Sequence, residues 1–177
     1  MAPMIATAAA DAKVALVADA AYLDAFLSLA ARASQRLLCS IFIVDITPTL
    51  DRAHPVDTML ESLAAAAWRG ADTRLLIGGS RDNISLAEAA DAARSRARAR
   101  SIPCRWLTSR AARGSHAKLV VADDSVLIGS HNWSPGALSG NHQTQDSVLV
   151  ASRDLAALSA TRFEAQWLRA EEPHAAP

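Results

Sequence analysis

The residues best suited to chemistry in this 177-residue chain lie between positions 115 and 134. His116 and Lys118 are two apart in an apolar run, so on a strand both side chains leave the same face. Ser130 and Asn132 repeat this spacing after a polar triplet at 123–125. A neutral imidazole can act as a nucleophile and, once protonated, as a general acid. Ammonium, hydroxyl and amide groups can hold phosphate oxygens. The combination predicts metal-independent phosphodiester chemistry.

The length of the turn determines whether the pair His116 and Lys118 lies on the same face as the pair Ser130 and Asn132. A three-residue turn at 123–125 pairs Lys118 with Ser130 and His116 with Asn132, so that all four side chains share one face. A two-residue turn shifts the register by one and sends Ser130 and Asn132 to the other face. We expect the three-residue turn, because it gathers the polar groups in one place.

The wider pattern resembles the HKD signature of the phospholipase D superfamily. It is His116-x-Lys118-x4-Asp123, followed by Gly129-Ser130-x-Asn132. The resemblance implies that His116 is the nucleophile and forms a phosphohistidine. It also implies that Lys118, Ser130 and Asn132 bind the substrate phosphate and that Asp123 supports the motif structurally. No metal ion or cofactor is implied.

The number of motifs bears on assembly. Superfamily members usually carry two such motifs, or one motif in a chain that dimerises, and only one occurs here. The chain therefore resembles the short, single-motif, bacterial endonuclease-like branch. This resemblance implies a homodimer in which His116 of the second subunit protonates the leaving oxygen.

Two positions depart from the family pattern. Five residues separate Asp123 from Gly129 where six are expected, and we expect the deletion to shorten the turn without moving the site. The family often carries a downstream Glu that orients the catalytic histidine, and Gln145 stands in its place with Asp146 beside it. Either residue is a candidate orienter. Gln can accept a hydrogen bond from the imidazole but brings no full charge to an imidazolium.

The charge pattern gives a hint about the substrate. The net charge is zero, yet seven of the arginines fall between positions 94 and 113. Arg110 and Arg113 directly precede the motif, so we expect them to contact nucleic acid. His131 could line the rim of the cleft and join them. The alternative for the arginine run is a solvated helix face, and for His131 a plain loop position.

The motif needs a scaffold, and the periodicity of the chain predicts one. Apolar runs predict strands at 14–17, 37–44, 73–77, 104–107, 117–122, 126–128 and 148–151. Helical spacing predicts helices at 22–33, 55–68, 85–100 and 154–170. Ser85 with Glu88 suggests a capping box at the start of the third helix. The alternation predicts an α/β fold: a mixed sheet flanked by helices, the phospholipase D-like half, dimerising across the motif face.

Length and composition set the outer limits. The size suits one catalytic domain at 13–171, with flexible segments at 1–12 and 172–177. With 51% hydrophobic and 20% charged residues and no long apolar run, we expect a cytoplasmic protein without stable membrane association. Cys39 and Cys104 lie in apolar segments and belong to no metal-binding pattern, so we expect free thiols.

Three functions fit these features. The first is a homodimeric nuclease that cleaves nucleic-acid phosphodiesters without metal. The second is a phospholipid hydrolase or transphosphatidylase. The third is a catalytically silent domain that binds nucleic acid or a partner protein, which the uncertain identity of the histidine orienter keeps open. A fold alone does not choose among them.

Overall fold

The computed structural model describes residues 12–46, 54–108, 114–139 and 143–170. The strands are β1 (Lys13–Ala18), β2 (Arg36–Ile41), β3 (Asp72–Ile77), β4 (Cys104–Trp106), β5 (Lys118–Ala122), β6 (Ser125–Gly129) and β7 (Asp146–Ala151). The helices are α1 (Ala21–Arg32), α2 (Pro55–Trp68), α3 (Ile84–Ala99), α4 (Pro135–Ser139) and α5 (Arg153–Trp167). The predicted flexible ends lie largely outside the described residues.

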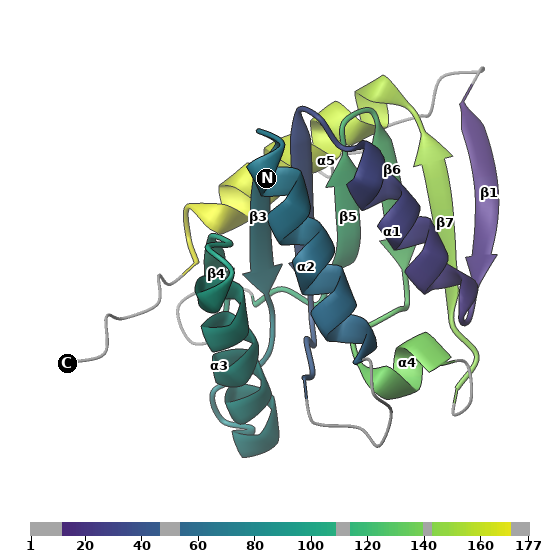
Figure 1. Cartoon of the computed structure of the whole chain (residues 1–177). Helices are drawn as coiled ribbons and strands as arrows, with labels where there is room; N and C mark the ends of the chain where they lie inside the picture. Colours follow the sequence, from purple (N-terminus) through teal and green to yellow (C-terminus); the bar gives the residue numbers. More distant parts are fainter. Residues whose placement is uncertain (1–11, 47–53, 109–113, 140–142, 171–177) are drawn as a thin grey trace, which may run out of the picture.

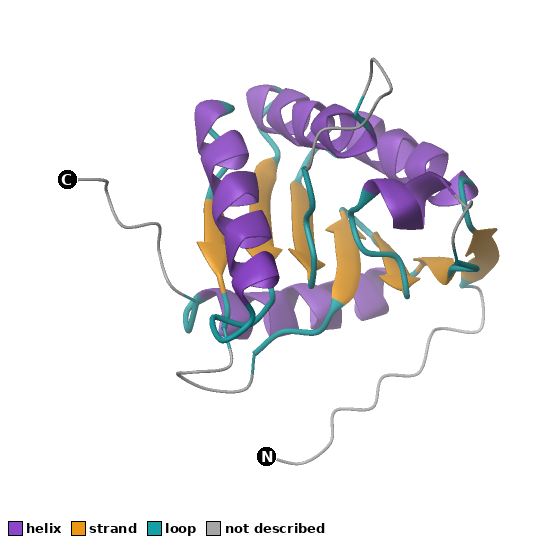
Figure 2. Ribbon diagram, turned by 90° about the horizontal axis from the view of Figure 1, so that it is seen from below, coloured by secondary structure: helices purple, strands orange, loops and turns teal. Residues whose placement is uncertain are grey.

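All seven strands form one mixed sheet in the order β1-β7-β6-β5-β2-β3-β4. Strands β2, β3 and β4 are parallel, whereas the remaining pairs are antiparallel. Helices α1, α2 and α3 cover one face and α5 crosses the other (Figures 1 and 2). Each face buries its own apolar cluster, one centred on Phe26 and Trp133 and the other on Phe163. The predicted α/β class, with a mixed sheet flanked by helices, is confirmed.

Local signals explain most element ends, with three differences. Pro55 opens α2, where its missing N–H is harmless. The capping box predicted at Ser85 is wrong: Asn83 is the N-cap of α3, and its side chain accepts a hydrogen bond from the Leu86 N–H at 3.1 Å. Strand β2 ends at Ile41 rather than at residue 44, because Val44 instead forms an isolated bridge with Trp133. The short helix α4 was not predicted.

The turn between β5 and β6 has two residues, so the expected three-residue turn is wrong. Ala122 pairs with Ser125, and Leu119 pairs with Ile128. Asp123 takes φ of 48°, a left-handed conformation that Asp tolerates better than most residues. The five-residue spacing from Asp123 to Gly129 is therefore accommodated in the turn.

Candidate active site

His116 and Lys118 meet at one edge of the sheet, where β2 ends and β5 begins. The Lys118 Nζ lies 3.2 Å from Nδ1 and 3.3 Å from Nε2 of His116, and 3.3 Å from the His116 carbonyl oxygen. Both side chains also contact Phe42: its ring centroid is 4.3 Å from the imidazole and 4.9 Å from Nζ. The imidazole is exposed, so a substrate could reach it.

Lys118 is held in an unusual setting for a lysine. The residue is only 9% exposed, and burial lowers its pKa below the ordinary value of 10.5. Its contact with His116 places a cation that can bind phosphate directly beside the imidazole.

Packing beneath the motif fixes the approach of His116 to the sheet. The Ser115 hydroxyl lies 3.2 Å from that of Ser40 and accepts a hydrogen bond from the Ala117 N–H at 3.3 Å. Gly78 lies directly against the Ser115 carbonyl and Phe42, so that a Cβ at position 78 would collide with the backbone. The sequence analysis did not identify these supports, because they are contacts between segments that lie far apart in the chain.

Asn132 follows the β5–β6 hairpin, and its side chain binds the backbone just after the end of β2. Its Oδ1 accepts a hydrogen bond from the Ile43 N–H at 3.2 Å, directly after Phe42. The next residue, Trp133, donates its backbone N–H to the Ile43 carbonyl and is fully buried. Asn132 is thus placed by the end of β2 rather than by pairing with His116 across a strand.

The Ser130 side chain does not lie on the same face of the sheet as Lys118, where it was predicted. Its N–H donates to the Asp146 carbonyl, which continues the β6–β7 ladder by one residue. Strand alternation then places Ser130 on the α5 face, opposite to Lys118. The Ser130 hydroxyl donates to Gln145 Oε1 at 2.7 Å and accepts from the Asp146 N–H at 3.0 Å. The expectation that all four polar side chains share one face is wrong, because the shorter turn moves Ser130 by one register.

The candidate orienters do not reach His116 within one chain. Besides Ser130, the side chain of Gln145 contacts Gln143 at 3.4 Å, and its backbone N–H donates to Asp19. Among the described residues, neither Gln145 nor Asp146 forms a hydrogen bond with the imidazole of His116.

Asp123 lies at the opposite end of β5 and acts as an anchor. Its carboxylate accepts hydrogen bonds from the N–H groups of Ser34, Gln35 and Arg36 at 2.9 to 3.0 Å, and from the Ser34 hydroxyl at 3.1 Å. Partial burial alone would raise its pKa, but these four hydrogen bonds outweigh burial and lower it. This geometry agrees with the structural role that the resemblance implies.

His131 is a core residue, and the expectation that it lines the rim or contacts nucleic acid is wrong. The side chain is fully buried and stacks on Tyr22, with ring centroids 4.4 Å apart. Its Nδ1 lies 2.8 Å from the Ser147 hydroxyl and its Nε2 lies 3.1 Å from the Asp19 carbonyl. Burial lowers its pKa, which favours the neutral form. It follows Ser130 directly after the end of β6, and its side chain points to the opposite side, into the core.

Several further predictions concern residues or features away from this edge. Arg110 and Arg113 lie outside the described residues. Cys39 and Cys104 are buried free thiols. Within the described ranges, no three His, Cys, Asp or Glu side chains gather into a group that could hold a metal ion. Of the helices described, none is long and apolar enough to cross a bilayer.

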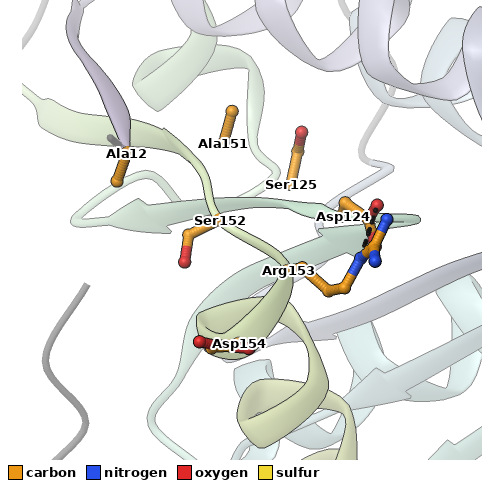
Figure 3. A pocket seen from close by; sticks show the side chains of 7 residues that line it. All are labelled: Ala12, Asp124, Ser125, Ala151, Ser152, Arg153 and Asp154. Carbon is orange, nitrogen blue, oxygen red and sulfur yellow. Dashed lines mark hydrogen bonds and ion pairs between the residues drawn. The ribbon is translucent and has the colours of Figure 1, made fainter. Parts of the chain in front are cut away.

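A pocket of about 420 Å³ lies at the opposite edge of the sheet, away from His116 (Figure 3). It is lined by Ala12, Asp124, Ser125, Ala151, Ser152, Arg153 and Asp154. Arg153 points across it to Asp124, at 3.4 Å from Nε to Oδ2. The pocket adjoins the turn that Asp123 anchors and contains none of the residues predicted to act on phosphate.

Comparison with known proteins places this fold. Residues 26–167 match the family model described as the PLD-like domain of cardiolipin synthase. Nuc, a phospholipase D family member from Salmonella typhimurium, superposes with a TM-score of 0.74 at 17% identity, covering 93% of this chain and 100% of Nuc. Phosphatidylserine synthase from Haemophilus influenzae superposes with a TM-score of 0.67 at 16% identity, over 85% of this chain and 35% of the synthase.

A third solved structure is TrmBL2, an archaeal chromatin protein with a novel mode of DNA binding. It superposes with a TM-score of 0.58 at 15% identity, over 91% of this chain and 54% of TrmBL2. No curated protein sequence matches significantly. At these identities the solved structures establish the fold, whereas the family model spans well over half of the sequence. The chain therefore belongs to the phospholipase D superfamily, through its PLD-like domain.

Proposed function

We propose that this protein is a metal-independent nuclease that cleaves nucleic-acid phosphodiester bonds as a homodimer, through a phosphohistidine on His116. One observation carries the proposal: the exposed imidazole of His116 lies 3.2 Å from the buried ammonium of Lys118. A nucleophile and a phosphate-binding cation are thus already adjacent. Such preorganised charge stabilises the negative phosphoryl oxygens of a transition state.

The reaction runs in two steps. In the first, a neutral ring nitrogen of His116 attacks phosphorus, and the bond from phosphorus to the leaving oxygen breaks. The protonated His116 of the second subunit gives its proton to that oxygen. In the second, a water oxygen attacks the phosphohistidine while the second imidazole accepts the water proton, and the phosphorus–nitrogen bond breaks. Both histidines return to their starting forms.

Lys118 and Asn132 have distinct supporting roles in this scheme. The Lys118 ammonium binds a nonbridging phosphate oxygen as a compact charge. Asn132 lies beside Phe42 and spends its Oδ1 on the Ile43 N–H, which leaves its amide NH₂ to donate to phosphate. Ser130 acts instead as a clamp between β6 and β7. This assignment replaces the phosphate-binding role expected for Ser130.

Nucleic acid is the preferred substrate because Arg110 and Arg113 directly precede the motif. The arginines further upstream carry less of this argument, because Arg94, Arg96 and Arg100 form ion pairs with carboxylates of α2 and α3. The DNA binding of TrmBL2 shows that a structurally similar protein can use DNA as a partner. The names of the cardiolipin synthase family model and of the phosphatidylserine synthase favour a second candidate, a lipid phosphodiester. The chemistry at His116 is the same for both substrates.

One experiment separates these functions. Purified protein in excess EDTA is offered labelled single- and double-stranded DNA, RNA and phospholipid vesicles, with His116→Ala protein as the control. We expect wild-type protein alone to cleave nucleic acid. Lipid hydrolysis without nucleic-acid cleavage would favour the second candidate. Binding without cleavage would indicate a silent binding domain, and activity that requires added Mg²⁺ or Zn²⁺ would contradict the metal-independent mechanism.

A further inference from the structure

A cavity of about 280 Å³ lies beside β4, the last strand of the sheet, and we call it the arginine pocket. Arg94 and Arg98 line it from α3, and Arg105 lines it from β4. Residues 102–104 and Trp167, at the end of α5, complete its wall. Figure 1 shows β4 at the edge of the sheet, close to the C-terminal end of α5. Among the residues that the structure describes, no carboxylate lines this pocket, so its charge favours an anion.

Neighbouring groups hold the guanidiniums of the pocket in place. The Arg105 Nη1 donates to the Trp167 carbonyl at 2.9 Å, and the Arg105 guanidinium carbon lies 4.8 Å from the centroid of the Trp167 ring. Arg94 donates to Asp91 at 2.9 Å, whereas Arg98 is exposed. A guanidinium has five N–H donors, so one such bond does not prevent it from binding a second partner. Arginines can bind a phosphate through two parallel hydrogen bonds.

The backbone of β4 adds a donor to the pocket. The Leu75 N–H donates to the Pro103 carbonyl, and the Leu107 N–H donates to the carbonyl of residue 77, so residues 103 and 107 face β3. Successive residues of a strand direct their backbone groups to opposite sides, and the Cys104 N–H therefore points to the free edge, where the pocket lies. An N–H at the edge of a sheet can donate to an anion.

The Trp167 ring shapes the pocket but offers little surface for a nucleic-acid base. This residue is only 9% exposed, and the guanidinium carbons of Arg74 and Arg105 lie 5.4 and 4.8 Å from the centroid of its ring. A base needs an open aromatic face on which to stack. The pocket therefore suits a phosphate group rather than a base. Its small volume agrees, since sites for whole ligands span roughly 300–1,000 Å³.

Trp106 connects the arginine pocket to the catalytic edge. The guanidinium carbon of Arg94 lies 5.6 Å from the centroid of the Trp106 ring, and that of Arg81 lies 4.9 Å from it. The Trp106 Nε1 donates to the Gly78 carbonyl at 2.8 Å. Gly78 in turn packs against the carbonyl of the residue before His116. Arginines thus follow one another from the pocket toward the nucleophile.

Strand pairing gives the separation between the pocket and the site. One row of paired residues crosses the sheet from Lys118 through β2 and β3 to Trp106. Three spacings of about 4.8 Å and the two-residue step from Trp106 back to Cys104, about 7 Å, give roughly 16 Å. At about 3.4 Å of rise for each nucleotide of one strand, this distance corresponds to about five nucleotides.

We infer that the arginine pocket binds a backbone phosphate of the same nucleic-acid strand whose scissile phosphate lies at His116, about five nucleotides away. The inference rests on the proposed function, because it assumes a nucleic-acid substrate. A nucleic-acid strand carries a phosphate at every nucleotide, so it can occupy the pocket and the site together, which a single phosphodiester cannot. Arg98 and Arg105 provide most of the charge, since Arg94 is paired with Asp91.

A binding experiment tests the pocket without using activity. Arg98→Gln is made in the His116→Ala protein, which leaves the oligonucleotide intact. Arg153→Gln is the matched control, because Arg153 is an arginine with an 82% exposed side chain at the opposite edge of the sheet. Affinity is measured by fluorescence anisotropy over a range of salt concentrations, for a strand of about 16 nucleotides and for a dinucleotide. Circular dichroism verifies that each variant is folded.

The long strand should respond to Arg98→Gln and the dinucleotide should not. We expect the salt slope of the long strand to fall by about one unit and its affinity at least about threefold, because one phosphate contact is lost. The dinucleotide is too short to reach the pocket from His116. The Arg153→Gln protein should bind both oligonucleotides as the parent does. An unchanged salt slope in the Arg98→Gln protein would overturn the inference.

Oligonucleotides with two charged linkages test the spacing. Uncharged methylphosphonates replace all phosphates except one cleavable linkage and a second phosphate at a varied distance from it. With His116 present, kcat/KM should be highest when the two phosphates lie about five nucleotides apart, and Arg98→Gln should remove this maximum. A maximum that persists in Arg98→Gln protein, or no dependence on spacing in wild type, would place the second phosphate outside the pocket.

Bis(para-nitrophenyl) phosphate separates this inference from the proposed function. This compound has a single phosphodiester and can occupy only the site at His116, so Arg98→Gln protein should cleave it at the wild-type rate. If wild type cleaves neither this compound nor nucleic acid, the proposed function fails, whatever the binding experiment shows. If wild type cleaves both and Arg98→Gln leaves the salt slope unchanged, only the pocket inference fails. Equal weakening of the dinucleotide and the long strand would also overturn it, because the pocket would then bind small anions unconnected with the strand at His116.

Discussion

Lys118 places a compact cation against His116, and the same ammonium lies 4.9 Å from the centroid of the Phe42 ring. Lys118→Arg keeps the charge but brings a wider, planar group with a different donor geometry. We expect it to lower the cleavage rate at least about 100-fold, the scale of losing one preorganised charge donor. Thermal unfolding should show that the variant is folded. Near wild-type activity would mean that this position needs only a positive charge.

The lowered pKa of Lys118 also predicts the alkaline behaviour of the wild type. Burial disfavours the ammonium, so Lys118 loses its proton at a lower pH than an ordinary lysine at 10.5. If the charged form binds phosphate, kcat/KM should fall as pH rises, with a midpoint below 10.5. The residual activity of Lys118→Arg should lack this fall, because arginine stays protonated.

Asp123 is expected to act on stability through its charge. Its folded pKa lies below the ordinary 3.8, so its stabilising contribution is present above that pH and is lost as pH falls through the folded pKa. Asp123→Asn tolerates the same left-handed backbone but loses charge-assisted hydrogen bonds, which should cost about 1.5–3 kcal/mol at neutral pH. Urea unfolding at pH 7 and below 4 measures this. Asp124→Asn, in the same turn, is the control, and an equal effect there would contradict the anchor role.

Substitution of His131 is expected to lower the stability of the protein without changing its cleavage rate. Burial lowers its folded pKa, so the stability it supports is present above the ordinary value of 6.5 and is lost as pH falls from 6.5 through the folded pKa. His131→Gln should cost about 1–3 kcal/mol of unfolding free energy and remove this acid dependence. Its cleavage rate under conditions where it is folded should match wild type. A large loss of rate in the folded variant would return His131 to the site.

At the scale of elements, the contact between β6 and β7 positions the residues after Gly129. A Cβ at this position would collide with Ser147 and the Asp146 carbonyl, both in β7. Gly129→Ala should therefore push the strands apart and lower the unfolding free energy by about 1–3 kcal/mol. It should also reduce cleavage, since Ser130 and Asn132 follow directly.

Gly70→Ala is a control that distinguishes a steric collision at position 129 from a general loss of stability. Gly70 takes φ of 97° with no atom within 4 Å of an added Cβ, so Gly70→Ala pays only the conformational cost, about 1–2 kcal/mol. Its cleavage rate should be unchanged, because it lies between α2 and β3, away from the site. If both variants lose activity equally, loss of stability and not displacement of the site explains Gly129→Ala.

At the scale of the whole molecule, the proposed mechanism needs a second chain, because this sequence carries a single motif. One imidazole must be neutral to attack phosphorus, and another must be protonated to release the leaving oxygen. Wild type and His116→Ala protein are denatured together and refolded at varied ratios. If both histidines serve one shared site, activity falls as the square of the wild-type fraction, and an equal mixture keeps about one quarter by random pairing.

If each subunit had its own complete active site, the same mixtures would show a different dependence of activity on the wild-type fraction. If each subunit has a complete site, the fall is linear and about one half of the activity remains in the equal mixture. Subunit exchange is verified by a size-tagged wild-type chain that forms a mixed dimer. A linear curve with confirmed exchange would falsify the shared site, and His131 could not supply the missing acid because it is fully buried.

Local patterns in the sequence were enough to predict the fold class and the chemical pair. Apolar periodicity predicted each of the seven strands and four of the five helices, because alternation and helical spacing report which side chains must be buried. The two-residue spacing of His116 and Lys118 predicted their meeting, although His116 lies just before β5 and the Lys118 side chain reaches back to it. Helical periodicity did not predict α4, because this helix is only five residues long.

Tertiary contacts decided the features that depend on distant segments. The Asp123 carboxylate binds the backbone of residues 34–36, and the two-residue turn it belongs to shifts Ser130 to the α5 face. Asn132 is placed by Ile43, and His131 is turned inward by Tyr22 and Ser147. The partners in these contacts lie 16 to 109 residues apart, and strand register carries no signature in the residues between them. The sequence thus determined which groups could act on a phosphodiester, whereas packing decided which of them reach one.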